Sequence, residues 1–100
     1  MRYYILSFDR QPGVSYKGFH QTFTSDPRIQ RWWHYLQSCY IVGTELSAQE
    51  LSRHAREAFD RYKLRNTHLV VRVDLDCRQG MLPPKAWQWI KDNAALDDGT

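Results

Sequence analysis

The residue with the clearest potential for chemistry is Asp9, which ends an almost uninterrupted apolar run from Tyr3. An irregular segment that contains Pro and Gly, Arg10 to Gly13, follows it. A carboxylate at the end of a buried strand can bind a hard cation such as Mg²⁺, with phosphate oxygens as further ligands. One carboxylate binds weakly, so two copies of Asp9 across a dimer axis would make a stronger site. The alternative role is structural: Asp9 accepts hydrogen bonds from the loop amides.

Other familiar catalytic patterns do not occur in the sequence. The four histidines are scattered, without the spacing of a zinc site. Phosphate-loop, dinucleotide-binding and serine-hydrolase motifs are missing. Cys39 and Cys77 are too few for a disulfide framework, so both thiols are expected to stay reduced. Asp74 and Asp76 have the spacing of a metal pair, but the topology expected below places them at the opposite rim of the sheet from Asp9.

The charge balance is mildly basic, with 14 Lys and Arg against 11 Asp and Glu, a formal net charge of +3. The excess lies in residues 1–65, which hold ten basic and six acidic side chains. Ten of the 14 basic residues are arginine, whose guanidinium suits bidentate contacts with phosphate. Charge alone fits a nucleic-acid-binding protein and an ordinary soluble domain equally well. The candidate nucleic-acid contacts are Arg10, Lys17, Arg28 and Arg31.

Four segments in the first half of the chain are expected to position these residues. The apolar run 3–9 predicts a central strand. Tyr16, Phe19 and Phe23 share one helical face, and Asp26-Pro27 ends that helix. Residues 32–42 are rich in aromatic and β-branched side chains, which predicts two strands joined near Gln37-Ser38 or one long bent strand.

The second half begins with the clearest local signal, the capping box Ser47-Ala48-Gln49-Glu50, which starts a helix. Its apolar stripe is Leu51, Ala55, Ala58 and Tyr62. Residues 68–75 alternate as a half-buried strand does, with Leu69, Val71, Val73 and Leu75 on one face. Pro83-Pro84 opens a last helix over residues 85–93, in which Trp87, Ile90 and Ala94 share a stripe.

This order of elements predicts an α+β protein with a ferredoxin-like βαββαβ fold and an added short C-terminal helix. The 100 residues form one domain, with a core over residues 3–75 and an extension over 76–100. Asp9 then meets His68 and the turn near Ser38. Two helices cover only one face of such a sheet, so either a second copy or the C-terminal helix must cover the other. Trp32 and Trp33 point to opposite faces, one into the helix-covered core and one toward a partner or the C-terminal segment.

The strand ending in Asp9, the segment Gln37-Ser38-Cys39-Tyr40, the capped second helix and the strand 68–75 resemble the small CRISPR-adaptation subunit of the Cas-two type. The run Trp32-Trp33-His34-Tyr35-Leu36 is more similar to the SinR-like small bacterial proteins grouped with that family. The resemblance covers roughly residues 3–75. It implies a ferredoxin-like homodimer in which Asp9 takes the metal position and Ser38 the position of a nearby catalytic serine.

The resemblance leaves two roles open, since some members of that family cleave nucleic acid with a metal ion and others only position DNA. We therefore expect a homodimer that binds DNA or RNA, with magnesium-dependent endonuclease activity as an open question. The alternative is a non-catalytic dimeric module that binds a protein or a small anionic nucleotide. We expect a cytoplasmic location without membrane insertion, because the apolar runs are much shorter than the roughly 20 residues needed to span a bilayer.

Overall fold

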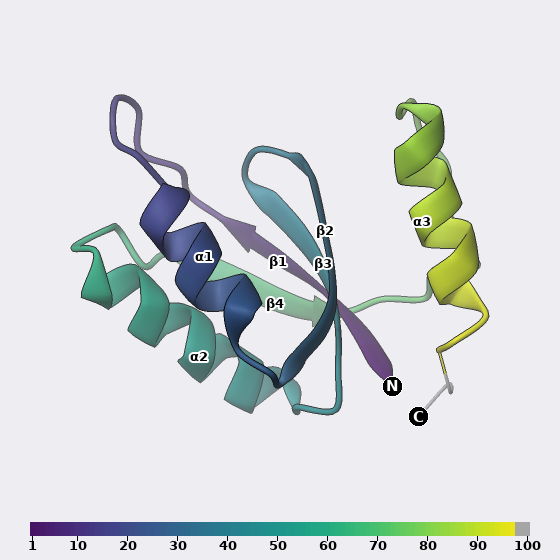
Figure 1. Cartoon of the computed structure of the whole chain (residues 1–100), viewed down its shortest axis with the longest axis horizontal. Helices are drawn as coiled ribbons and strands as arrows, with labels where there is room; N and C mark the ends of the chain where they lie inside the picture. The colour runs from purple at the N-terminus through teal and green to yellow at the C-terminus, as the bar shows by residue number, and fades with distance from the viewer. Residues whose placement is uncertain (98–100) are drawn as a thin grey trace.

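The computed structural model describes residues 1–97, and residues 98–100 of the expected extension lie outside the described part. Strands and helices follow one another in the order predicted from the sequence (Figure 1). In residues 1–97 no helix combines the length and apolar character needed to cross a lipid bilayer. The elements are β1 (Arg2–Phe8), α1 (Lys17–Ser25), β2 (Ile29–Leu36), β3 (Cys39–Thr44), α2 (Ala48–Arg61), β4 (His68–Arg72) and α3 (Pro84–Ala94).

The first strand lies inside a four-stranded antiparallel sheet with the order β2-β3-β1-β4. Leu6 of β1 is opposite Tyr40 of β3 on one side and Val70 of β4 on the other. Side chains of a strand alternate between the two faces of the sheet, and helices lie against both faces here, which explains the apolar sequence of β1. The expected neighbours of the first strand and the two-strand interpretation of residues 32–42 are confirmed.

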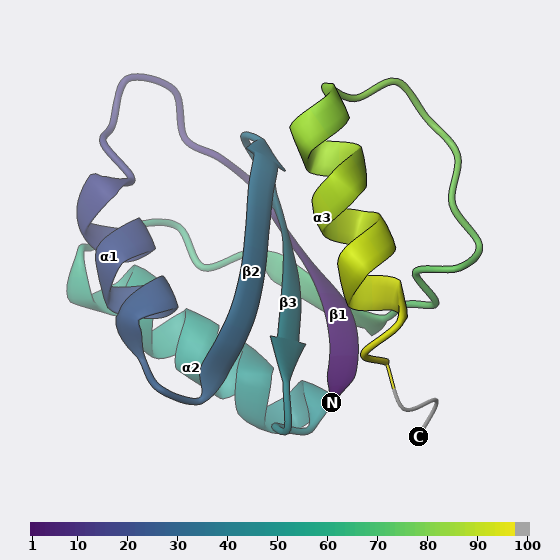
Figure 2. The same cartoon turned by 45° about the vertical axis from the view of Figure 1, so that its right-hand side comes forward.

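Helix α2 begins with the predicted capping box and lies with α1 on one face of the sheet (Figures 1 and 2). The Ser47 hydroxyl accepts from the Glu50 amide at 3.2 Å, and the Glu50 carboxylate accepts from the Ser47 amide at 2.9 Å. Tyr62 was expected in the apolar stripe, but the helix ends before it and its side chain is exposed. The other three members of the stripe are buried: Leu51, Ala55 and Ala58.

Aromatic rings fill the layer between these two helices and the sheet. Phe19 of α1 stacks on Phe59 of α2 with ring centroids 4.1 Å apart. Phe8 of β1 lies against both helices, with its centroid 5.9 Å from Phe19 and 5.3 Å from Phe59. Tyr40 of β3 completes the cluster. Two helices and two strands are thus held together by one aromatic core.

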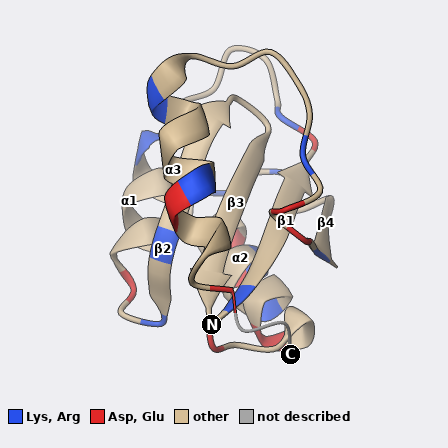
Figure 3. Ribbon diagram, turned by 90° about the vertical axis from the view of Figure 1, so that its right-hand side faces the viewer, with Lys and Arg blue, Asp and Glu red and all other residues tan. Residues whose placement is uncertain are grey.

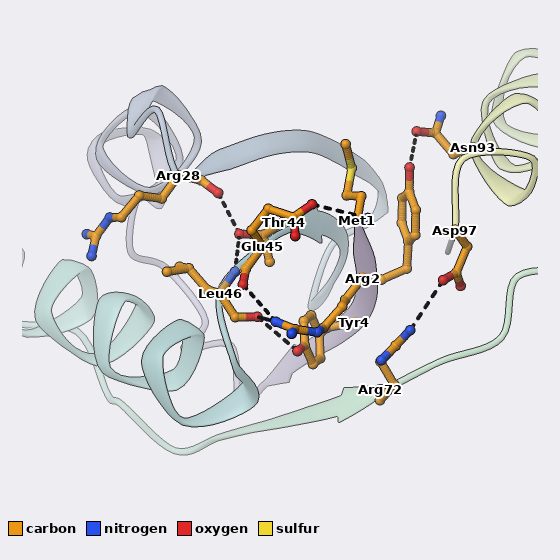
Figure 4. Close-up of polar contacts among 11 residues, drawn as sticks. Met1, Arg2, Tyr4, Arg28, Thr44, Glu45, Leu46, Arg72, Asn93 and Asp97 are labelled. Atoms are coloured by element: carbon orange, nitrogen blue, oxygen red, sulfur yellow. Dashed lines mark hydrogen bonds and ion pairs between the residues drawn. The ribbon is translucent and has the colours of Figure 1, made fainter. Parts of the chain in front are cut away.

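Helix α3 packs on the opposite face of the sheet, which gives the molecule three layers (Figure 2). A buried hydrogen bond of 2.7 Å joins the Tyr3 hydroxyl to Asn93, and Arg72 pairs with Asp97 just beyond the helix at 3.3 Å (Figure 4). The two tryptophans lie on opposite faces as expected, but the expectation that one of them fills the core under α1 and α2 is wrong. Trp33 is buried in the α3 layer, whereas Trp32 remains 41% exposed at the rim of the other face. The α3 layer consists of Tyr3, Trp33, Ile41, Leu75, Ala86 and Ile90.

The last strand is shorter than residues 68–75 and ends at Arg72. Its inward side chain is Val70, which packs against the core under α1 and α2. Leu69 and Val71 lie on the other face and are 61% and 44% exposed, because α3 does not reach over this part of the sheet. The predicted alternation is correct, but half of the expected apolar face is uncovered.

We expect Ile90→Ala to lower the free energy of unfolding by about 2–5 kcal/mol, since it leaves a cavity between α3 and the sheet. Met81, in the loop before α3, is 96% exposed, so Met81→Ala is a matched control with a change within about 0.5 kcal/mol. Urea unfolding measures both. Equally small losses would show that α3 does not pack on the sheet in solution.

Candidate functional site

Three segments meet at the end of β1, as the expected topology required. The Phe8 amide donates to the Ser38 carbonyl at 3.0 Å, and the Asp9 amide donates to the Thr67 carbonyl at 3.1 Å. The first strand therefore ends between the β2–β3 turn and the start of β4. Asp74 lies at the opposite rim, because the neighbouring Val73 amide donates to the carbonyl of Tyr3 near the start of β1.

The Asp9 carboxylate is engaged by a residue that the sequence analysis did not single out. Its Oδ2 atom lies 2.7 Å from Nη1 of Arg65, and both side chains are about half exposed. Asp9 makes this ion pair in place of the expected hydrogen bonds to loop amides. Arg65 belongs to the basic turn that precedes β4. The predicted topology places this turn beside the end of β1, and that placement could have indicated Arg65 as a partner of Asp9.

The loop after β1 is tied to the same turn by further hydrogen bonds. The Arg65 amide donates to the Gln11 side chain at 2.6 Å, and the Gln11 amide donates to the Tyr16 hydroxyl at 2.9 Å. The Arg10 guanidinium lies 4.4 Å from the centre of the Tyr16 ring, a cation–π contact. Its Nη1 atom also donates to the Gln37 carbonyl at 3.4 Å. These contacts hold Arg10 in place at the end of the sheet.

Two of the four predicted nucleic-acid contacts, Arg10 and Lys17, lie near this end of the molecule. Gly18 brings α1 against the turn after α2, because the Tyr62 ring occupies the space that a Cβ at residue 18 would need. Lys17 is thereby placed close to the turn that carries Lys63 and Arg65. We call Arg10, Lys17, Lys63 and Arg65 the basic end.

The other two predicted contacts, Arg28 and Arg31, lie at the opposite end of the sheet. Arg31 is opposite Gly43, which pairs with Tyr3 near the start of β1. Arg28 forms a bidentate ion pair with Asp26, in which Nη2 and Nε of Arg28 donate to the two carboxylate oxygens at 2.9 and 3.0 Å. This hydrogen bonding lowers the pKa of Asp26 to about 2. The four candidate contacts are therefore divided between the two ends of the sheet, because β2 runs in the same direction as β1 and its first residues lie near the start of β1.

Ser38 lies in the turn between β2 and β3, close in the fold to the end of β1. Its carbonyl accepts from Phe8, while in residues 1–97 its hydroxyl makes no hydrogen bond. No base is therefore in hydrogen-bond contact with Ser38 within one chain. Its catalytic role stays a prediction that rests on the resemblance.

Among residues 1–97, Asp9 belongs to no cluster of metal-ligating side chains. Across the described residues, no three His, Cys, Asp or Glu side chains gather closely enough to hold a metal ion. Asp9 is instead neutralised by Arg65. Binding of Mg²⁺ by Asp9 stays a prediction that requires ligands from a second copy.

Each histidine is held by a partner from the protein. Burial lowers the pKa of His34, whose Nδ1 atom lies 3.1 Å from the Cys39 carbonyl. The other three contacts are His20 to the Tyr40 hydroxyl at 2.7 Å, His54 to the Phe23 carbonyl at 3.1 Å and His68 to the Ser52 hydroxyl at 2.7 Å.

Comparison of the chain with models of protein families, with curated proteins and with solved structures finds no match. The proposals below therefore depend on the geometry and on the resemblance in the sequence.

We expect Asp9→Asn to lower the free energy of unfolding by at most about 1 kcal/mol, because an exposed ion pair contributes little. The loss should be equal in EDTA and in millimolar Mg²⁺, and Arg65→Gln should reproduce it. Thermal melts of the three proteins in both buffers measure this. Two Asp9 carboxylates facing each other across a dimer axis would give the opposite result: the Asn variant would be more stable in EDTA, and stabilisation by Mg²⁺ would disappear.

Proposed function

We propose that this protein is a small cytoplasmic homodimer of ferredoxin-like fold, similar to the Cas-two and SinR-like proteins, that binds nucleic acid through its basic end. The observation that carries the proposal is the gathering of Arg10, Lys17, Lys63 and Arg65 from three segments at the end of β1. The strand order β2-β3-β1-β4 with α1 and α2 on one face supports the fold. Free Cys39 and Cys77 suit a reducing compartment.

The basic end has the properties that phosphate binding needs. Lys17, Lys63 and Arg65 are exposed, and Arg10 is oriented by the Tyr16 ring. Lys63 adopts a left-handed backbone conformation (φ 55°) in a tight turn, so the segment has a defined shape before any ligand binds. The α3 side differs, since acidic and basic residues are interspersed there (Figure 3). Phosphate contacts of this kind position a nucleic acid without reading its sequence.

The role proposed for Asp9 is to hold Arg65 in place, so the geometry around Asp9 favours binding over metal-dependent cleavage at the basic end. A non-catalytic module for a protein or a small anionic nucleotide is the alternative function. The two functions differ in their dependence on salt, because a protein that neutralises several phosphates of a duplex releases counterions and loses affinity steeply as salt rises.

We expect affinity for a mixed-sequence DNA duplex to fall linearly on a plot of log affinity against log salt. The double variant Lys17→Gln/Lys63→Gln should lower the slope by about two, since each lysine that is removed leaves one phosphate with its counterion. Lys85→Gln/Lys91→Gln removes the same charge from α3 and should leave the slope unchanged. Fluorescence anisotropy with a labelled duplex measures this. A shallow slope for the wild type would favour the alternative function.

The homodimer is proposed from the part of the second sheet face that α3 leaves uncovered. Leu69 and Val71 of β4 and Tyr35 of β2 are exposed there, and Ile5 of the central strand is only half-buried. A second copy would bury the same side chains on both partners, as a twofold interface does. We call these four residues the open strip.

We expect the wild type at about 50 µM to sediment at twice the 12.0 kDa chain mass, since a standard-size interface is occupied at that concentration. Leu69→Glu/Val71→Glu should sediment as a monomer, because charges in the open strip oppose its burial. Met81→Glu adds a charge at an exposed loop position and should remain dimeric. A monomeric wild type would contradict the dimer and leave α3 as the sole cover of this face.

A further inference from the structure

A serine and a histidine on neighbouring elements form an ordered pair far from Asp9 in sequence. The hydroxyl of Ser52 on α2 lies 2.7 Å from Nε2 of His68, the first residue of β4. The Nδ1 atom of the same ring lies 2.7 Å from the Asn66 carbonyl oxygen. The Phe59 ring, 5.9 Å from the imidazole by ring centroids, packs beside it. Three groups therefore stand in the order of nucleophile, base and the group that orients the base.

The hydrogen bonds define which nitrogen of His68 carries the proton. A carbonyl oxygen only accepts, so Nδ1 must carry a hydrogen and donate it to Asn66. In the neutral imidazole Nε2 then has a free lone pair and accepts the hydrogen of the Ser52 hydroxyl. This tautomer is the one that a general base for a serine nucleophile requires.

An open pocket with two unpaired arginines adjoins Ser52. The pocket has a volume of about 280 Å³ and is lined by Gln49, Ser52, Arg53 and Arg56. Both arginines are exposed, and in the described chain neither makes a hydrogen bond or ion pair with another residue. Hydrogen bonds with Ser47 lower the pKa of the Glu50 carboxylate, and the charge of Arg53 also contributes to this lowering. Two exposed guanidinium groups beside one hydroxyl have the charge and the donors that suit an anion with several oxygens.

The position of Ser52 on a helix decides between two classes of ester. Ser52 lies in the second turn of α2 (Ala48–Arg61), so its own amide and that of Arg53 are used in helical hydrogen bonds and cannot hold the oxyanion of a carboxylic ester beside the Ser52 hydroxyl. The two guanidinium groups match instead the non-bridging oxygens of a phosphate ester. The site thus favours phosphoryl chemistry.

We propose that Ser52 is a nucleophile toward phosphate diesters, with His68 as its base and Arg53 and Arg56 as the binding groups for the phosphate. The Ser52 oxygen forms a bond to phosphorus while its proton passes to Nε2 of His68. The bond from phosphorus to the leaving oxygen breaks, and the leaving alcohol takes the proton from His68. The product is a phosphodiester of Ser52. Water then forms a bond to phosphorus and gives a proton to His68, the bond from phosphorus to the Ser52 oxygen breaks, Ser52 takes the proton from His68, and a phosphate monoester leaves.

The experiment uses bis(4-nitrophenyl) phosphate with the folded, unmodified protein in EDTA. We expect a burst of one 4-nitrophenolate per chain and a covalent 4-nitrophenyl phosphoryl adduct on the peptide that contains Ser52, located by mass spectrometry. Ser52→Ala should abolish both, and His68→Gln should slow the burst by about 10²-fold or more. Ser25→Ala, which removes an exposed serine at the end of α1, is the matched control and should react like the wild type.

The arginine pair and the fold are tested separately. Arg53→Gln/Arg56→Gln changes only exposed side chains and should raise the substrate concentration for half-maximal burst rate by about tenfold or more, at an unchanged thermal midpoint. An adduct on another residue, a burst that survives Ser52→Ala, or no adduct on the folded wild type would overturn the proposal. The proposed function is tested on the same wild-type samples, because fluorescence anisotropy reads the binding of duplex DNA and mass spectrometry reads the labelling of Ser52. Labelling without DNA binding would refute only the nucleic-acid role.

Discussion

The structure depends on the burial of β1 on both of its faces. Tyr4, Leu6 and Phe8 lie under α1 and α2, and Tyr3 lies under α3. Two helices on one side of a sheet leave the apolar side chains of the other side in water, at a cost proportional to their exposed area. Helix α3 covers part of that face and so removes much of the cost. The segment between β4 and α3 connects the sheet to this helix. Ala86 and Ile90 of α3, within the extension after residue 75, are therefore part of the core.

This constraint also decides where polar chemistry can occur. Charged residues occur only at the two ends of β1: Arg2 is the first residue of the strand, and Asp9 directly follows it where the strand leaves the sheet. Asp9 stands at that point, and the loop 10–16 and the turn 63–66 converge on it. Charged side chains lie close together there because the loop after β1 and the turn before β4 meet at this end of the sheet. The basic end follows from the fold as much as from the composition.

Local patterns in the sequence predicted the order of the elements, the capping box at Ser47 and the meeting of Asp9 with the start of β4. Each of these depends on short-range periodicity or on strand order. The ion pair of Asp9 with Arg65 and the pairing of Ser52 with His68 could not be predicted, because they depend on the distance between segments that are 56 and 16 residues apart. The exposure of Leu69 and Val71 could not be predicted from the sequence either. The alternation of side chains defines the two faces of a strand, but it does not show how far α3 extends over one of them.

The turn between α2 and β4 links the two proposed sites. Its hydrogen bonds run from the Asn66 side chain to Asp60 at 2.9 Å and from the Arg65 amide to Gln11 at 2.6 Å. The same turn presents Arg65 to Asp9 and the Asn66 carbonyl to His68. Ser52 lies next to the buried Leu51, at the border of the stripe that packs α2 on the sheet, and so reaches the edge strand beside this turn. The basic end and the Ser52 pair therefore share one structural element, since adjacent residues of this turn contact Asp9 and His68.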